Sequence, residues 1–206
     1  MQYKLLILFT TCLFFHGQKT FAQKTYSPIS VDTKMKDSFS FTKKWGYPWD
    51  VFKDNRTGKF SKNGGQKILR GDTAHLFFTA NCYTNVQGGY NIKYCYANRN
   101  KDTITLVFSD GLPAYASEFY VYITRDSFTC EPKTMYESLL PGHKITNEVS
   151  KQKLVLNKPG YAINDIIKGY IDIEFIEIYS VPNKEPEKSN FYLRGYFKTP
   201  LKRQTN

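Results

Sequence analysis

The chain has 206 residues, with 29 lysines and arginines against 18 acidic residues and a formal net charge of +11. This length suits one ordinary domain with a substantial core. The basic residues are spread along the chain without a run of about five or more like charges, which excludes a basic nucleic-acid-binding arm, and no nucleic-acid partner is expected. The charge favours an acidic protein or an anionic envelope polymer instead.

Residues 1–22 have the pattern of a secretory signal peptide. Lys4 precedes an apolar run, Leu5 to Phe15, and small residues follow where a signal peptidase cuts. The run is shorter than the about 20 apolar residues that span a bilayer, so no transmembrane segment is expected after cleavage. Without Lys4 and Lys19 the charge balance is 27 minus 18, or +9. We therefore expect residues 23–206 to form a single β-rich domain of a secreted, periplasmic or cell-surface protein.

Both tryptophans lie close together in the segment Lys43-Lys44-Trp45-Gly46-Tyr47-Pro48-Trp49. Its glycine and proline predict a loop or a strand edge. Aromatic rings on a rigid loop beside cations are typical of surfaces that stack on sugar rings or anchor a protein interface. Trp45, Tyr47 and Trp49 are therefore the candidate ligand-binding residues. The alternative is that the tryptophans plug one end of the domain, because large aromatic side chains are usually buried.

A hairpin is predicted around Gly88-Gly89, because both glycines accept the positive φ of a two-residue turn. Counting outward from this turn places Cys82 directly opposite Cys95, at a pair whose Cα atoms are about 4.5 Å apart. This distance suits a disulfide, which an exported protein can form. We predict a Cys82–Cys95 disulfide, with free buried thiols as the alternative. Cys130 is then either a buried thiol or a site of intermolecular pairing, and we favour the buried thiol.

The same register places Tyr83, Tyr94 and Tyr96 on one face of the hairpin. That face is either a binding platform or a surface beneath a second sheet. Further along the chain, the loop from Ser109 to Ser117 is long for a hairpin connection. Long ordered loops often carry binding function, although a packed cap fits equally well.

Alternation of apolar and polar residues predicts strands in the second half of the chain. At Phe175 the apolar set moves by one position, which predicts a bulge near Phe175-Ile176. Helical signals are limited to single turns at 136–140 and 163–168. In chain order, the predicted strands are 38–42, 66–70, 73–86, 90–97, 103–108, 118–124, 127–130, 145–149, 153–156, 168–179 and 191–198.

These elements predict an all-β fold: an antiparallel β-sandwich or open barrel of about 10 short strands, with one or two short helical turns. The pattern does not separate a sandwich from a barrel, because both are built from short strands with regularly spaced turns.

Few residues suit catalysis or metal binding. After the leader only His75 and His143 remain, and no HExxH, paired CxxC or Gly-x-Ser-x-Gly pattern occurs. Asp172 and Glu174 share a strand face about 7 Å apart, as in some glycoside hydrolases, but any solvated strand face has this spacing, and we favour that interpretation. The segment 54–58 resembles a calcium loop without its spacing, so a plain turn is predicted. No catalytic residue, metal or cofactor is expected.

We therefore expect a non-enzymatic binding protein of the bacterial periplasm or cell surface. Through loops on a β scaffold it would hold another protein or an anionic envelope glycan, as an immunity or inhibitor protein does. A carbohydrate-binding module that uses Trp45, Tyr47 and Trp49 is the first alternative, and a hydrolase with an unrecognised site is the second. The leader's end and the richness in Lys, Asn and Tyr resemble exported proteins of Gram-negative bacteria, which concerns compartment rather than activity.

Overall fold

The computed structural model describes residues 25–36, 39–44, 46, 51–54, 56–68, 77–110, 117–136 and 139–204. The predicted signal peptide, residues 1–22, lies outside this part of the chain. Within it the protein is mostly β, and no helix is long and apolar enough to cross a membrane. The helical segments of this part are 3-10 turns of three or four residues: η1 (Ser40–Lys43), η2 (Asn63–Gly65) and η3 (Val86–Gly88).

Eleven strands form one mixed sheet that folds back on itself and nearly closes. The sheet path is β1-β10-β9-β8-β7-β13-β12-β11-β2, and β5 pairs with β13 and β6. Its strands are β1 (Ser27–Pro28), β2 (Ser30–Val31), β5 (Ala80–Thr84), β6 (Tyr90–Ile92), β7 (Tyr94–Asn100), β8 (Thr103–Ser109), β9 (Glu118–Thr124), β10 (Ser127–Lys133), β11 (Lys144–Leu156), β12 (Ile166–Ser180) and β13 (Glu187–Arg203).

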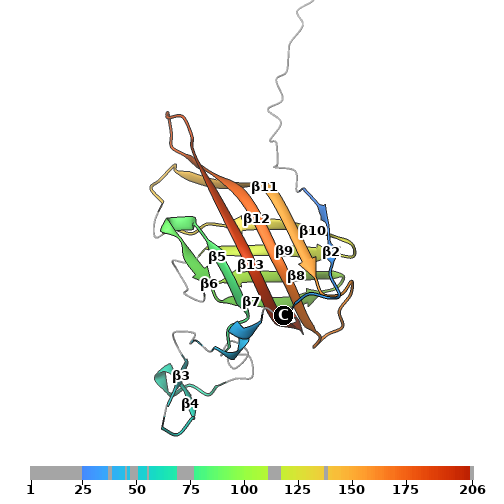
Figure 1. Ribbon diagram of the computed structural model, residues 1–206. Coiled ribbons are helices and arrows are strands. Elements are labelled where there is room, and N and C mark those ends of the chain that lie inside the picture. Colours follow the sequence, from blue (N-terminus) through green and yellow to red (C-terminus); the bar gives the residue numbers. More distant parts are fainter. Residues whose placement is uncertain are drawn as a thin grey trace, which may run out of the picture.

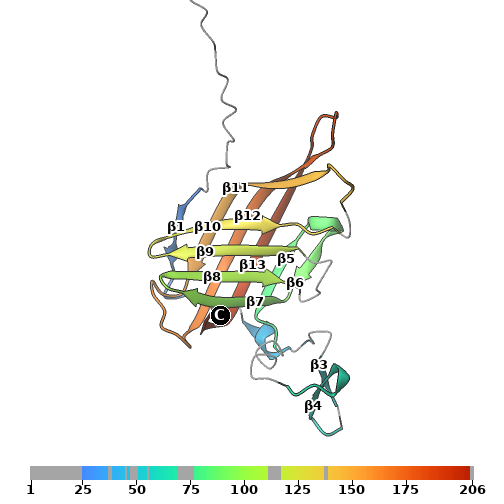
Figure 2. The same ribbon diagram turned by 180° about the vertical axis from the view of Figure 1, so that it is seen from behind.

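The sheet forms two layers whose strands cross, seen from opposite sides in Figure 1 and Figure 2. We call them the β7–β10 layer (β1, β10, β9, β8 and β7) and the β11–β13 layer (β2, β11, β12, β13, β5 and β6). The predicted β-rich fold is confirmed. The predicted antiparallel arrangement is confirmed only in part: most pairs are antiparallel, but β13 pairs in parallel with β7 and β11 pairs in parallel with β2, so the sheet is mixed.

Strand β13 joins the two layers. It pairs with β12 over most of its length, with β5 on its other side, and with β7 through its last residues, 201–203. Gly195 is the point of closest approach to β5: its φ is +151°, and a Cβ there would lie 2.5 Å from the Cα of Cys82. A glycine is required here because any side chain would collide with the β5 backbone.

The side chain of Gln152 links the two ends of the sheet by hydrogen bonds. Gln152 of β11 accepts a hydrogen bond from the backbone N–H of Cys130 in β10, at 2.9 Å. Its amide group donates to the backbone oxygen of Thr25 and to Ser27 Oγ, at 2.8 and 3.0 Å. Gln152 therefore bonds both layers and the N-terminal segment at a point where no continuous ladder joins β10 to β11.

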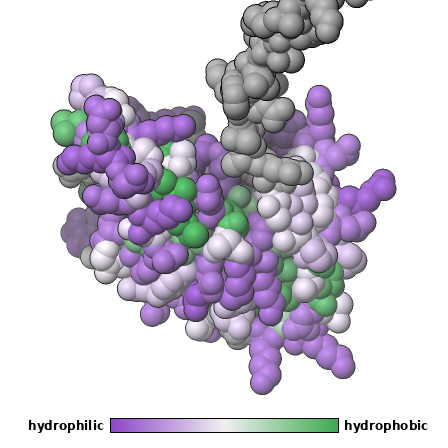
Figure 3. Space-filling view, turned by 90° about the horizontal axis from the view of Figure 1, so that it is seen from above, coloured by the Kyte–Doolittle hydropathy of each residue, from purple (hydrophilic) through white to green (hydrophobic). Residues whose placement is uncertain are grey.

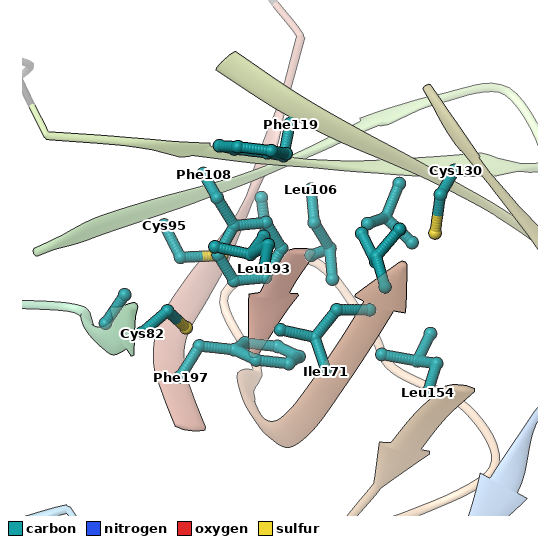
Figure 4. Packing of buried hydrophobic residues seen from close by; sticks show 14 of the residues in the cluster. Cys82, Cys95, Leu106, Phe108, Phe119, Cys130, Leu154, Ile171, Leu193 and Phe197 are labelled. Carbon is teal, nitrogen blue, oxygen red and sulfur yellow. The ribbon is translucent and has the colours of Figure 1, made fainter. Parts of the chain in front are cut away.

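The core lies between the layers and consists of their inward-facing apolar side chains (Figure 4). The predicted alternation is confirmed in β8, β9 and β12, whose inward residues include Leu106, Val121 and Ile171, each fully buried. Ring contacts join the layers directly: Phe108 meets Phe197 at 5.2 Å between centroids, and Phe119 meets Phe175 at 5.9 Å. Edge-to-face pairs of this kind stabilise a core beyond the area that they bury.

The predicted bulge near Phe175-Ile176 is wrong. The pairing of β12 with β13 continues unbroken through these residues, and the irregularity lies in the partner strand β11, between Val149 and Lys151. Glu177 therefore keeps to the inward set and is buried, at 6% exposure, where it accepts a hydrogen bond from the Tyr136 hydroxyl at 2.6 Å.

The other local corrections concern segments without a regular partner. The predicted strand 38–42 is replaced by η1, in which the Thr42 hydroxyl and N–H both donate to the Phe39 carbonyl. The predicted helical turn at 163–168 is wrong, because β12 begins at Ile166. The plain turn predicted at 54–58 is confirmed: it joins β3 (Val51–Lys53) to β4 (Phe60–Lys62), and Asp54 Oδ1 accepts from two backbone N–H groups.

The predicted hairpin register around Gly88-Gly89 is also wrong. Cys82 lies opposite Ile92 rather than Cys95, because the connection is longer than two residues and contains η3, with Gln87 at a φ of +51°. Cys95 belongs to the next strand, β7, opposite Phe108. The predicted Cys82–Cys95 disulfide is therefore not formed in this structure.

The described cysteines, Cys82, Cys95 and Cys130, are free and buried. The buried thiol predicted at Cys130 is confirmed. Burial raises the pKa of all three thiols above the usual range. Cys82 and Cys95 come from different strands and lie in the same region of the core (Figure 4).

We expect the three thiols to resist alkylation in the native protein, because the thiolate is the reactive form and burial disfavours it. Iodoacetamide labelling followed by peptide mass mapping should find them unmodified natively and modified in urea without reductant. Fast native labelling would contradict the buried arrangement. Protection of Cys82 and Cys95 in urea until reductant is added would show a disulfide.

We expect Gly195→Ala to lower the free energy of unfolding by about 3 kcal/mol, because it combines an unfavourable φ with a collision against β5. Gly160→Ala is the matched control, since Gly160 has open space around its Cβ position. Urea unfolding of both variants measures the difference. Equal stabilities would show that β13 does not need a glycine at its contact with β5.

Candidate functional site

The residues predicted to bind a ligand, Trp45, Tyr47 and Trp49, lie outside the described residues. Gly46 between them is described, and a Cβ at this position would collide with the Phe78 ring and lie 2.9 Å from the Tyr94 hydroxyl. The centre of the predicted loop from Ser109 to Ser117, residues 111–116, likewise lies outside the described part.

The three hairpin tyrosines do not form one platform. Tyr83 is on the outer face of the β11–β13 layer, 41% exposed and 6.1 Å from the Tyr192 ring. Tyr94 and Tyr96 belong to β7 and stack on the outer face of the other layer, where Tyr94 is buried. The prediction of a shared face is wrong because these residues belong to two hairpins rather than one.

Asp172 and Glu174 lie on the outer face of β12, as the solvated-face interpretation predicts. Arg194 of β13 approaches them at 3.5 and 3.3 Å, and Lys151 of β11 at 3.6 and 3.0 Å. These contacts form an ionic ladder across three strands that leaves both carboxylates matched by cations. His143 contacts Tyr179, not these carboxylates, and His75 lies outside the described residues. In this part of the chain no cluster of three or more His, Cys, Asp or Glu side chains could hold a metal.

A groove beside this ladder is the candidate site. It has a volume of about 530 Å³ and lies on the outer face of the β11–β13 layer, where the segment after β2 crosses the edge of β11. We call it the lysine groove. Its lining residues are Asp32, Lys34, Met35, Lys36, Lys153, Val155, Tyr170 and Tyr196.

Strand register builds the floor of the lysine groove. Val155 of β11, Tyr170 of β12 and Tyr196 of β13 are successive partners across the three strands, so their side chains stand in one row. The Tyr170 and Tyr196 rings are 5.0 Å apart between centroids. Burial raises the pKa of Tyr170, so its hydroxyl stays protonated at neutral pH and can donate a hydrogen bond.

Three lysines stand around this floor. Lys153 comes from β11, while Lys34 and Lys36 come from the segment after β2. That segment is held by an Asx turn: Asp32 Oδ1 accepts from the backbone N–H of Lys34 at 2.9 Å, and the backbone N–H of Asp32 donates to Leu156 at 2.9 Å. Three lysines against this one aspartate leave the groove with an excess of positive charge.

The basic surface continues past Tyr196. Phe39 packs edge-on against the Tyr196 ring, at 6.4 Å, and is itself buried. Lys168 and Lys198, opposite each other on β12 and β13, place their ammonium groups 5.5 and 5.9 Å from the Phe39 ring centre. The Phe39 ring attracts both ammonium groups, which keeps these two cations side by side next to Tyr196.

Figure 3 shows the end of the molecule seen from above, which is largely hydrophilic with small scattered hydrophobic spots. Large apolar patches mark protein or membrane contacts, and this view shows none.

Sequence reasoning missed the lysine groove, because Lys153 is more than a hundred residues from Lys34 and Lys36 and each lysine has the pattern of an ordinary solvated charge. One signal was the position of Tyr170 and Tyr196 on strand faces, where the nearest outward residues along each strand are charged: Lys168, Asp172, Arg194 and Lys198. Comparison with protein-family models, with curated proteins and with solved structures finds no match to this chain.

We expect Arg194→Gln to lower the free energy of unfolding by no more than about 1 kcal/mol, because its ion pairs are partly exposed and Lys151 still faces both carboxylates. Urea unfolding beside an Arg56→Gln control, in the exposed turn after β3, measures the effect. A decrease in the free energy of unfolding of more than about 3 kcal/mol would show that the ionic ladder is essential to the stability of the layer.

Proposed function

We propose that this protein is a non-catalytic binding protein that holds an anionic envelope polymer in the lysine groove. One observation carries the proposal: three lysines, against a single aspartate, surround a floor of two tyrosines. Ammonium groups attract carboxylate, sulfate or phosphate groups, and tyrosine rings stack on sugar rings.

The extent of the basic surface favours a polymer over a small ion. Beyond Tyr196, Lys168 and Lys198 add two cations on the same outer face, so one extended anionic chain would meet both groups of lysines. Each contact would be worth little alone, because exposed charges are screened by salt. Several contacts along one chain add up to useful affinity.

The proposal includes export to the periplasm or cell surface, for which the pattern of residues 1–22 is the support. It also keeps Trp45, Tyr47 and Trp49 as ligand-binding residues. Their segment follows directly on η1 and the Phe39 that contacts Tyr196. An acidic protein partner is the second candidate, since it would meet the same cations.

We expect the triple variant Lys34→Gln, Lys36→Gln, Lys153→Gln to bind anionic polysaccharides at least tenfold more weakly than the parent. Affinity electrophoresis against polygalacturonate, heparin and polyphosphate measures this, and the parent's affinity should fall steeply between low and high salt. The matched control replaces Lys144, Lys184 and Lys188, which are exposed and have the same total charge.

Equal weakening in both triple variants would show that net charge, not the lysine groove, determines binding. If the parent protein binds none of the three polyanions, the proposal of an anionic polymer as ligand is rejected. In that case affinity purification from the native envelope at two salt concentrations tests the second candidate, an acidic protein partner. Such a partner should elute at the higher salt concentration.

A further inference from the structure

A second groove lies on the opposite outer face, along β8. The outward residues of β8 are small, Thr103, Thr105 and Val107, while the strands on either side bear larger ones. Two recesses of about 410 and 730 Å³ adjoin there and share the residues Asn98 and Val107. We call the continuous depression the tyrosine groove.

Its walls follow from strand register. Val107 is flanked by Tyr96 of β7 and Tyr120 of β9, so a tyrosine stands on either side of the small side chain. One step along, Thr105 is flanked by Asn98 and Tyr122. The depression therefore runs along β8 because small residues sit between rows of aromatic and amide side chains.

The tyrosines of the β9 wall are held in place before any ligand arrives. The Tyr120 hydroxyl donates to Glu118 Oε2 at 2.5 Å, and Glu131 bonds the Tyr122 hydroxyl. Lys133 lies over the Tyr120 ring at 4.3 Å, and the Tyr120 and Tyr122 rings are nearly parallel at 6.2 Å. Fixed rings lose little entropy on binding.

These phenols also stay neutral. The hydrogen bond to Glu118 raises the pKa of Tyr120 to about 12, and burial raises the pKa of Tyr122 to about 12. The charged residues at the groove are balanced, with Lys101 and Lys202 against Asp102 and Glu118. Unlike the lysine groove, this groove has no excess charge with which to select an ion.

We propose that the tyrosine groove is a second binding site, for an extended neutral oligosaccharide. Aromatic walls provide stacking surfaces for sugar rings. Asn98, Asn100, Thr103 and Thr105 provide amide and hydroxyl groups that both donate and accept, as neighbouring sugar hydroxyls require.

The alternative occupant, an extended peptide, fits less well. Peptides that bind along a sheet usually bond to a free strand edge, and β8 is paired on both sides, by β7 and β9. The peptide would also need an apolar pocket for an anchoring side chain, whereas the aliphatic residues at this groove are limited to Val107, Ala97 and Pro200.

The test is affinity electrophoresis of the purified protein through gels that contain soluble neutral polysaccharides: hydroxyethylcellulose, glucomannan, laminarin or dextran. We expect retardation by at least one of them, unchanged by salt. Tyr122→Ala should weaken it about tenfold, the effect of losing one well-placed aromatic contact. Tyr83→Ala is the matched control, because Tyr83 is an exposed tyrosine on the outer face of the other layer, at 41% exposure.

Two further measurements keep this site apart from the lysine groove and from a folding defect. The Lys34, Lys36, Lys153 triple variant should retain neutral-polysaccharide binding, and Tyr122→Phe, which keeps the ring, should retain most of it. Three results would each overturn the proposal, whatever the result with polyanions. They are loss of retardation in the lysine triple variant, unchanged retardation in Tyr122→Ala, and no retardation of the parent protein by any of the neutral polysaccharides.

Discussion

The fold depends on the pairing of β13 with three other strands. Its 17 residues bond to β12 and β5 in one layer and to β7 in the other. The two layers are therefore parts of one sheet, and the core between them is fixed by main-chain bonds as well as by packing. Gly195 permits this, because the close approach of β13 to β5 leaves no room for a side chain.

Joining the layers in this way leaves both outer faces free for recognition. The inward residues are committed to the core, so function must be built from the alternate, outward positions. On the β11–β13 layer these positions combine an ionic ladder with the lysine groove. On the β7–β10 layer they combine tyrosines, threonines and asparagines with balanced charge. The same two-residue period that builds the core thus gives the two faces different chemistry.

Sequence patterns predicted the strands where alternation is strict. The span of β9 matches its prediction, Glu118 to Thr124, because one face of this strand is buried in the core along its whole length and the other face is partly exposed. The hairpin at Gly88-Gly89 was predicted in the wrong register, since a two-residue turn was assumed and Gln87 also takes a positive φ. That error carried over to Cys82 and Cys95, because register decides which side chains are opposite each other.

The candidate grooves were harder to predict for a physical reason. Each collects outward residues from several strands, and which residues share a row depends on the register between those strands. Turns and bulges set that register, such as the irregularity in β11 between Val149 and Lys151, and local spacing does not show them. Local spacing therefore favoured the tryptophan segment, where the aromatic residues are neighbours along the chain.

The position of β13 at the end of the chain has a consequence for biosynthesis. Its contacts reach far back: the Cys82 thiol donates to the Tyr196 carbonyl, 114 residues later. Contacts of such long range slow folding, because much of the chain must be brought together before they form. Until β13 has been synthesised, β5, β7 and β12 lack the strand that pairs with all three, and the two layers cannot close over the core.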